Sequence, residues 1–214
     1  MSLELSGTTP AIKGVAGSVS APALTGDDVD TGISFPSANT IKFSTGGVER
    51  MSITNSGVTG AGGKFASYAV IADQKAAGTA GGTSSTGSFV TRDLNTILTD
   101  PDTIVSVSSN QFTLQAGTYL ISASAPSYKG ARHQILIYNV TDSTVMAVGT
   151  SEYTASNVSV STRAFAQNKT TISGAKVFEV RHRVASAYAT YGFGVEANMG
   201  QPEIYTMVEI FKES

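Results

Sequence analysis

Few side chains in this 214-residue sequence are of types that carry out catalysis, and their spacing does not favour it. The sequence has two histidines and no cysteine, which removes thiolate nucleophiles, disulfides and cysteine zinc sites together. His182 alternates with Val180 and Val184, a pattern typical of a hydrogen-bonded histidine in a buried strand. His133 stands at the start of a predicted strand, so we expect it to be exposed or at an interface. No Gly-x-Ser-x-Gly motif is present, and we predict no catalytic residue and no enzyme activity.

Two further segments could bind small ions or cofactors. Asp27, Asp28 and Asp30 place three carboxylates within four residues, but they lack the spacing and the distal glutamate of a calcium loop. An Asx-type turn and a cation site are the two alternatives for this cluster. The glycine-rich stretch Gly78–Gly87 has no lysine and no following helix, so it is not a phosphate loop, and we expect a mobile surface loop. We predict neither a metal nor a cofactor.

Charged side chains alternate along the segment 176–184, where Arg181 and Arg183 share a predicted face with Glu179. This stripe is either a solvated strand face or an ion-paired ring around a trimer axis. Both alternatives stay open, and Arg181 and Arg183 are included among the predicted interface residues.

Tyrosines fall in or beside several predicted loops. A tyrosine offers a large rigid face and one hydroxyl, which suits contacts with carbohydrate or protein. We therefore predict Tyr128, Tyr153 and Tyr188 as receptor contacts.

The composition points away from nucleic acid and membranes and towards buried subunit surfaces. The net charge is −2 and the basic residues are scattered, so no patch would neutralise phosphates. The longest apolar runs, such as Ile135–Ile137, are too short to span a bilayer, and the N-terminus does not read as a secretory signal. Only 14% of residues are charged, against about 25% in typical soluble domains. Short uncharged side chains suit β-structure and oligomer interfaces.

Residues 1–64 are predicted to form a stem that contains one clear hairpin. The strands Thr40–Ser44 and Val48–Ile53 are joined by a turn at Gly46 and Gly47. One hairpin cannot bury enough apolar surface to be stable alone, so we expect hairpins from several subunits to share a core. A flexible leader is the alternative. Ala61–Gly63 is the predicted boundary.

Alternation assigns the hairpin side chains to faces. Four apolar residues are expected on one face, together with Glu49, and they are the predicted stem interface: Ile41, Phe43, Met51 and Ile53.

Residues 65–214 are predicted to form a head made of short strands separated by turn residues. Only Asp93–Leu98 has a pattern that could form a short helical turn. The predicted strands are Phe65–Ala72, Ser88–Arg92, Ile104–Ser108, Gln111–Leu114, Thr118–Ser124, Arg132–Val140, Val145–Thr150, Val158–Ala166, Lys176–Val184, Tyr191–Ala197 and Glu203–Lys212. This pattern predicts an all-β fold, a jelly-roll β-sandwich.

The last predicted strand, Glu203–Lys212, is apolar on both sides. Alternation places Ile204, Thr206, Val208 and Ile210 on one face and Tyr205, Met207, Glu209 and Phe211 on the other. A strand that is apolar on both faces must be covered on both. We therefore predict that Tyr205, Met207, Glu209 and Phe211 lie at a subunit interface.

Two parts of the sequence resemble a known class of proteins. Asp30–Pro36 followed by Ile41–Ile53 resembles the short stem module of tailed-phage fibre proteins, those of cyanophages in particular. A second series of motifs is similar to the heads of the same proteins, and more broadly to tumour-necrosis-factor-like and complement-type globular heads: Thr91–Thr96, Phe112–Ile121, Leu136–Asp142, Phe178–Arg183, Gly192–Val195 and Tyr205–Phe211. The resemblance implies a homotrimeric jelly-roll head with its C-terminal strand near the threefold axis.

The expected function follows from this resemblance. We expect a structural protein on the surface of a virus particle, assembled in the host cytoplasm, whose head attaches to a host glycan or protein. The alternative is a capsid decoration (cement) protein that clamps the phage head, which a stem this short also favours. The expected partners are two further copies of the chain and other virion proteins of the tail or capsid.

Overall fold

The computed structural model describes residues 16–60 and 67–213, and the chain divides into two compact units, residues 1–63 and 64–214. The predicted boundary at Ala61–Gly63, and the first two residues of the strand predicted from Phe65, lie outside the described residues. Every regular element within the described ranges is a β-strand, so the predicted all-β class is confirmed. No helix among these residues is long and apolar enough to cross a membrane.

The N-terminal unit is a single antiparallel sheet in which neighbouring strands follow the chain order. Its strands are β1 (Leu24–Thr25), β2 (Gly32–Ser34), β3 (Ile41–Thr45), β4 (Val48–Thr54) and β5 (Gly57–Thr59). The predicted hairpin is confirmed as β3 and β4. Gly46 and Gly47 both have positive φ, 58° and 70°, which is the geometry of a two-residue turn that matches the twist of the strands.

A β-bulge corrects one predicted face of this hairpin. Phe43 pairs with Met51, but Ser44 pairs with Glu49, so Arg50 is the extra residue. The bulge reverses the alternation, and Glu49 lies with Lys42 on the face opposite Met51. Lys42 Nζ is 2.6 Å from Glu49 Oε2. The prediction that Glu49 shares a face with Met51 was therefore wrong.

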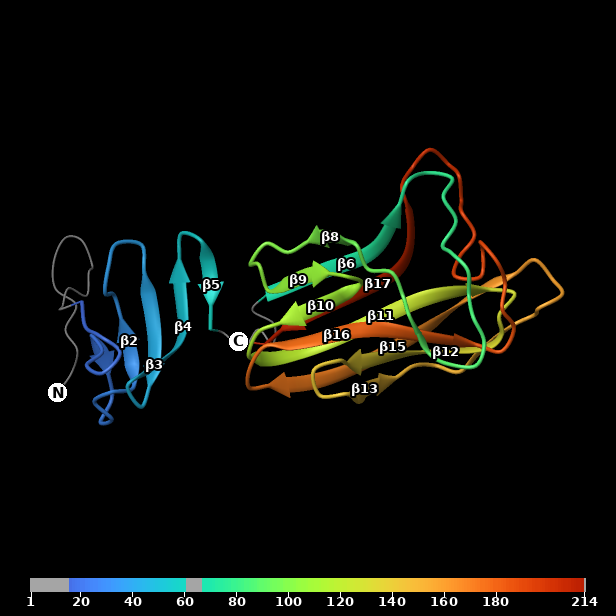
Figure 1. Cartoon of the computed structure of the whole chain (residues 1–214). Coiled ribbons are helices and arrows are strands. Elements are labelled where there is room, and N and C mark those ends of the chain that lie inside the picture. Colours follow the sequence, from blue (N-terminus) through green and yellow to red (C-terminus); the bar gives the residue numbers. More distant parts are fainter. Residues whose placement is uncertain (1–15, 61–66, 214) are drawn as a thin grey trace. The chain divides into compact units, whose positions relative to one another are not determined.

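The C-terminal unit is a sandwich of two antiparallel sheets (Figure 1). Its strands are β6 (Ser67–Lys75), β7 (Val90–Thr91), β8 (Thr96–Thr99), β9 (Val105–Ser108), β10 (Gln111–Leu114), β11 (Gly117–Tyr128), β12 (Ala131–Asn139), β13 (Thr144–Val148), β14 (Glu152–Thr154), β15 (Ser161–Ile172), β16 (Lys176–Val184) and β17 (Glu203–Lys212). The β17 sheet has the order β15-β11-β17-β6-β8. The β16 sheet has the order β13-β12-β16-β10-β9, with β14 paired to β12 and β7 to β16. The chain passes repeatedly between the sheets, so the predicted jelly roll is confirmed.

The core lies between the two sheets. From the β16 sheet come Phe112 and Phe178, whose rings stack with centroids 5.6 Å apart, and both are fully buried. From the β17 sheet, Ile121, Val208 and Ile210 are equally buried. Burial of large apolar side chains contributes about 1.5–3 kcal/mol each, so this layer dominates the stability of the unit.

Two predicted elements are wrong. Asp93–Leu98 forms no helical turn; its second half is strand β8, which pairs with β6. The reason is polar anchoring, because Asn95 Oδ1 accepts a hydrogen bond from Gln74 N (2.9 Å) and holds the segment extended. Tyr191–Ala197 forms no strand. Gly194 has a φ of 140°, which turns the backbone into a loop.

The loop predicted at Gly78–Gly87 is present within the segment 76–89, but it is anchored. Backbone hydrogen bonds tie it to the segment 188–194: Gly81 N to Gly194 O (2.9 Å), Gly82 N to Thr190 O (2.9 Å), Ser84 N to Tyr188 O (3.1 Å) and Phe193 N to Gly82 O (2.9 Å). The glycine content predicts mobility only when the backbone has no partner, and here two irregular segments supply partners to each other.

Gly81 allows this close approach, which gives a stability prediction. A Cβ at this position would lie 2.6 Å from Phe193 O, a backbone atom that cannot move alone. We expect Gly81→Ala to lower the free energy of unfolding by about 1–3 kcal/mol. The matched control is Gly174→Ala, where a Cβ meets nothing within 4 Å. Equal urea midpoints for the two variants would contradict the prediction.

The two ends of the C-terminal unit differ. Ser67, where β6 begins, is the register partner of Lys212, where β17 finishes, and we call this the entry end. The segments 76–89, 129–130, 155–160 and 185–202 connect strands at the opposite end, which we call the loop end (Figure 1).

Candidate functional site

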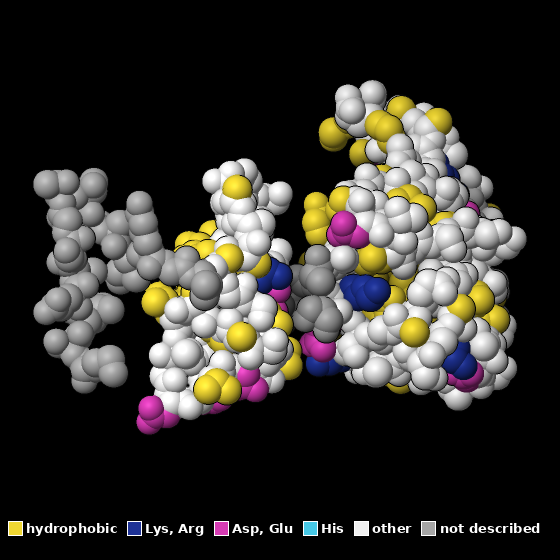
Figure 2. Space-filling model, turned by 90° about the vertical axis from the view of Figure 1, so that its left-hand side faces the viewer, with side chains coloured by type: hydrophobic (Ala, Val, Ile, Leu, Met, Phe, Trp, Pro, Cys, Tyr) yellow, Lys and Arg dark blue, Asp and Glu magenta, His cyan; other side chains and the backbone are white. Residues whose placement is uncertain are grey.

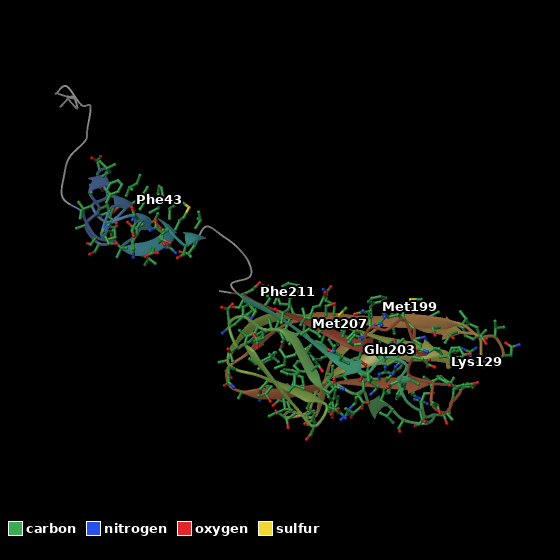
Figure 3. The ribbon with its side chains drawn as sticks, turned by 90° about the horizontal axis from the view of Figure 1, so that it is seen from above. Phe43, Lys129, Met199, Glu203, Met207 and Phe211 are labelled. Atoms are coloured by element: carbon green, nitrogen blue, oxygen red, sulfur yellow. The ribbon has the colours of Figure 1, made fainter. Side chains whose placement is uncertain are left out.

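One face of the N-terminal sheet carries a continuous group of apolar side chains along its register, with Thr45 and Arg50, joined by a hydrogen bond from Nε to Oγ1 (2.7 Å), at one edge. Because residues directly opposite in an antiparallel pair share a face, the register places seven side chains together. They are Leu24, Ile33, Ile41, Phe43, Met51, Ile53 and Val58. None of them is fully buried, and no second layer of strands covers them in the described part of this unit. The structure thus brings the four predicted stem residues onto one uncovered face; Figure 3 labels Phe43.

The outer face of the β17 sheet carries a second apolar surface. The register aligns Tyr68, Phe211 and Leu120 in one row across β6, β17 and β11. Four residues before Phe211 on β17, Met207 is opposite Ser124 of β11, and Ser124 is opposite Phe165 of β15. We call these five large side chains the apolar band: Tyr68, Leu120, Phe165, Met207 and Phe211. Tyr68 is 48% exposed and Phe165 is 53% exposed, whereas the other three are half-buried.

Glu209 lies between the two rows of the apolar band. It is opposite Ser122 on one side and Val70 on the other, and it is exposed. The same face carries Lys169, opposite Leu120, and Arg163, whose Nη1 donates to Ser124 Oγ (2.9 Å), so charged side chains border the apolar band. Uncharged white atoms predominate on the face seen in Figure 2, with hydrophobic side chains in separate yellow patches on both units.

A bulge in β17 separates Tyr205 from the other predicted interface residues. The register with β6 shifts between Ile204 and Met207. Tyr205 is 3% exposed, and its hydroxyl donates to Thr79 O (2.7 Å) within the same chain. Burial, with Glu203 nearby, raises the pKa of Tyr205 to about 12. The predicted alternation through 203–206 was wrong because both Tyr205 and Thr206 are buried.

Arg181 and Arg183 lie on the opposite layer, on the outer face of the β16 sheet. Arg181 Nε donates to Glu179 Oε1, and its guanidinium lies 3.4 Å from the centroid of the Tyr138 ring. The predicted charged stripe is thus paired within the chain at this point. A single threefold axis cannot be lined by both outer faces of one sandwich, so these arginines and Met207 belong to different surfaces.

The two histidines form a buried pair. Nδ1 of His133 lies 3.1 Å from Nε2 of His182, and Nε2 of His133 lies 2.7 Å from Thr162 Oγ1. The expectation that His133 is exposed was wrong, because β12 begins at Ala131 and its alternation turns His133 inward beside Ile135. Burial lowers the pKa of His133, and it lowers that of His182 to about 2. Within residues 67–213, no carboxylate bonds to either ring, which fits a structural role.

Arg92 is a buried cation that sequence reasoning missed. It is 1% exposed, Nε donates to Thr206 Oγ1 (2.9 Å), and Nη2 donates to Phe193 O (2.8 Å). Its guanidinium also lies 4.0 Å from the centroid of the Phe193 ring, which in turn stacks with His182. Burial lowers the pKa of Arg92 to about 9. The residue fastens the loop 188–194 to both sheets.

Two of the predicted receptor tyrosines meet at the loop end. The rings of Tyr128 and Tyr188 are 5.2 Å apart, edge to face, and Tyr191 is 6.5 Å from Tyr128. Lys129 Nζ lies 5.3 and 5.2 Å from the Tyr128 and Tyr188 centroids. Lys129 is at the end of the unit opposite Phe211 (Figure 3). The cluster is a compact aromatic and cationic surface.

The third predicted receptor tyrosine, Tyr153, is not part of this cluster. It is on β14 opposite Arg132 and is 63% exposed. Beside it is a groove of about 770 Å³ on the outer face of the β16 sheet, which sequence patterns did not indicate because β14 was not predicted.

The acidic cluster forms a turn. Asp28 Oδ2 accepts from Thr31 Oγ1 (2.7 Å) and Oδ1 from Asp30 N (3.4 Å), which is the Asx-type alternative. The bond from Thr31 lowers the pKa of Asp28, while the neighbouring Asp28 raises that of Asp30. In the two described ranges, no group of three acidic or histidine side chains is placed to hold a metal ion.

Comparisons with known proteins give structural similarity only. No protein-family model matches the sequence, and no curated protein does. Similar solved structures include the globular domain of the zebrafish complement 1qA protein, at 15% identity and a TM-score of 0.43 over 68% of this chain and 95% of that one. Murine APRIL at pH 5.0 is similar at 7% identity and a TM-score of 0.44, and at pH 8.0 at 6% and 0.41, each over 68% of this chain and 98% of that one. The jelly roll assigned above rests on the strand order of the chain itself.

Proposed function

We propose that the chain is a non-enzymatic, homotrimeric structural protein of a virus surface whose C-terminal unit attaches the particle to its host. The observation that carries this proposal is the pair of uncovered apolar sheet faces, one in each unit. A single-layer sheet such as the N-terminal one has no core of its own and requires a covering partner.

Copies of the same chain are the partners that the two faces favour. A symmetric assembly of copies of this chain would cover both the N-terminal face and the apolar band. If other proteins covered them, two unrelated partners would be needed. The threefold order and the viral setting come from the resemblance of residues 30–53 to phage stem modules. The loop end lies away from the point where the chain enters the C-terminal unit, which suits contact with a host surface. Repeated weak contacts would then sum to firm adsorption.

The mass of the full chain in solution and its binding to cells test this proposal. Light scattering should give about 66 kDa, three times the 22.0 kDa of one chain. The fluorescently labelled chain should bind host cells at micromolar concentration, and antibodies should label the surface of purified particles. A monomer at micromolar concentration, or unlabelled particles, would contradict the proposal.

A capsid decoration protein is the second candidate, and the small size of the N-terminal unit, residues 1–63, favours it over a long fibre. Copy number separates the two functions: hundreds of chains per particle would indicate cement, and tens or fewer would indicate a tail fibre.

A further inference from the structure

We propose that the groove on the outer face of the β16 sheet binds a saccharide bearing a carboxylate. This inference rests on the proposed attachment function and names the class of host ligand that the C-terminal unit would take. The groove belongs to the layer opposite the apolar band, so a trimer formed through the band leaves it open.

The groove has the size of a small-ligand site. Its volume of about 770 Å³ lies within the range of roughly 300–1,000 Å³ that such sites occupy. The strands β12, β14 and β16 and the end of the loop before β7 contribute its lining. Six of the lining residues are polar, charged or aromatic and face a ligand in the groove: Arg132, Gln134, Ser151, Glu152, Tyr153 and Arg183.

Two arginines supply the positive charge. Gln134 pairs with Arg183, and Ala185 N donates to Arg132 O (2.8 Å), so Arg132 and Arg183 lie on neighbouring strands of one face. Both side chains are exposed. In the described part of the chain neither guanidinium has a salt bridge or a side-chain hydrogen bond, unlike Arg181 and Arg92. A guanidinium matches a carboxylate through two parallel hydrogen bonds, so this pair fits such a group.

The other lining residues fit a sugar rather than a simple anion. The exposed Tyr153 offers its ring face to the apolar side of a pyranose. Gln134 Nε2 donates to Gly149 O (2.9 Å) and Ser151 Oγ (3.3 Å), which fixes the amide in the groove wall. The carboxylate of Glu152 can accept hydrogen bonds from sugar hydroxyl groups.

Glu152 also restricts the charge of the ligand. The groove lining carries two arginines and one glutamate, and the lowered pKa of His133 favours its neutral ring. The net charge of the lining is therefore +1. One carboxylate balances this charge, whereas a polyphosphate or a nucleic acid brings several negative charges close to Glu152. The groove therefore favours an acidic sugar with free hydroxyls.

Calorimetric titration of the full chain at pH 7 and low salt tests the proposal with matched sugars. The probes are tetragalacturonate and sialyllactose, each compared with its methyl ester, which keeps the rings and removes the charge. We expect at least one acid to bind with a Kd below about 1 mM and its ester to bind at least tenfold more weakly. If neither acid binds better than its ester, the proposal is overturned.

Variants place the binding in the groove. Arg132→Gln and Arg183→Gln should each weaken binding of the acid at least tenfold and leave that of the ester unchanged. Lys129→Gln removes a charge at the tyrosine cluster and is the control, for which no change is expected. Loss of binding in Lys129→Gln with retention in both arginine variants would overturn the proposal.

The two proposals fail in distinguishable ways. A trimeric chain that labels particles and cells, yet shows no preference for acid over ester, overturns the ligand class alone. A monomeric chain absent from particles overturns the attachment function, whatever the titration shows.

Discussion

Met207→Arg should convert the proposed trimer into monomers. Met207 is half-buried in one row of the apolar band, opposite Ser124, and Arg163 Nη1 already donates to that serine (2.9 Å). A second arginine here adds like charge beside Arg163 in each chain, and in the proposed trimer the two arginines would be buried with one nearby carboxylate, Glu209, so one positive charge stays unpaired. Burying an unpaired charge is costly, so we expect the dissociation constant to rise at least a hundredfold, about 3 kcal/mol or more.

Sedimentation across a concentration series measures this change. Val148→Arg is the matched control, since Val148 is 64% exposed on β13 of the other sheet and its replacement should leave the trimer intact. Far-ultraviolet dichroism confirms that the monomeric variant keeps its β-structure. If Met207→Arg remains trimeric at the lowest concentration, the apolar band is not the interface.

Acidification from pH 7 to pH 5 should destabilise the folded chain by about 2 kcal/mol through His182 alone. Burial, followed by the charge of Arg92 and by His133, lowers the pKa of His182 from 6.5 to about 2. Below pH 6.5 the unfolded chain binds a proton that the folded chain cannot. The stability is therefore complete above pH 6.5 and falls by about 1.4 kcal/mol per pH unit as the pH approaches 2. His133, whose pKa is also lowered, acts in the same direction.

Urea midpoints at pH 7 and pH 5, at one fixed protein concentration, measure the effect. His182→Leu removes the titrating group, so its loss of stability between the two pH values should be smaller than that of the wild type by about 2 kcal/mol. Burial raises the pKa of Asp73, which opposes the trend, but Asp73 is present in both proteins and cancels in the comparison. Equal losses in the two proteins would contradict the prediction.

The strands with strict alternation were the parts of the fold that the sequence predicted best. Lys176–Val184 and Gln111–Leu114 are observed with the predicted bounds because every second side chain enters the core. The errors lie at β-bulges, where the alternation of side chains between the two faces of a strand is interrupted. The bulge at Arg50 moved Glu49 to the other face, and the bulge between Ile204 and Met207 buried Tyr205.

The candidate site was less accessible to sequence reasoning. Tyr128 and Tyr188 are 60 residues apart and meet because the loop 188–194 is held by backbone hydrogen bonds to the loop 76–87 and by Arg92, whose burial no local pattern indicates. The groove depends on β14, three residues with no alternation to detect. By contrast, the apolar stem residues were predicted together because hairpin register is local.

The pairing of Ser67 with Lys212 has a consequence for how such a protein can change. Both ends of the C-terminal unit lie side by side across β6 and β17, so the whole jelly roll could be exchanged for another without rerouting the chain on either side of it. A tag fused after Lys212 would emerge at the entry end, far from the loops. Exchange of the segment between these two neighbouring ends could thus replace one jelly roll with another as a unit.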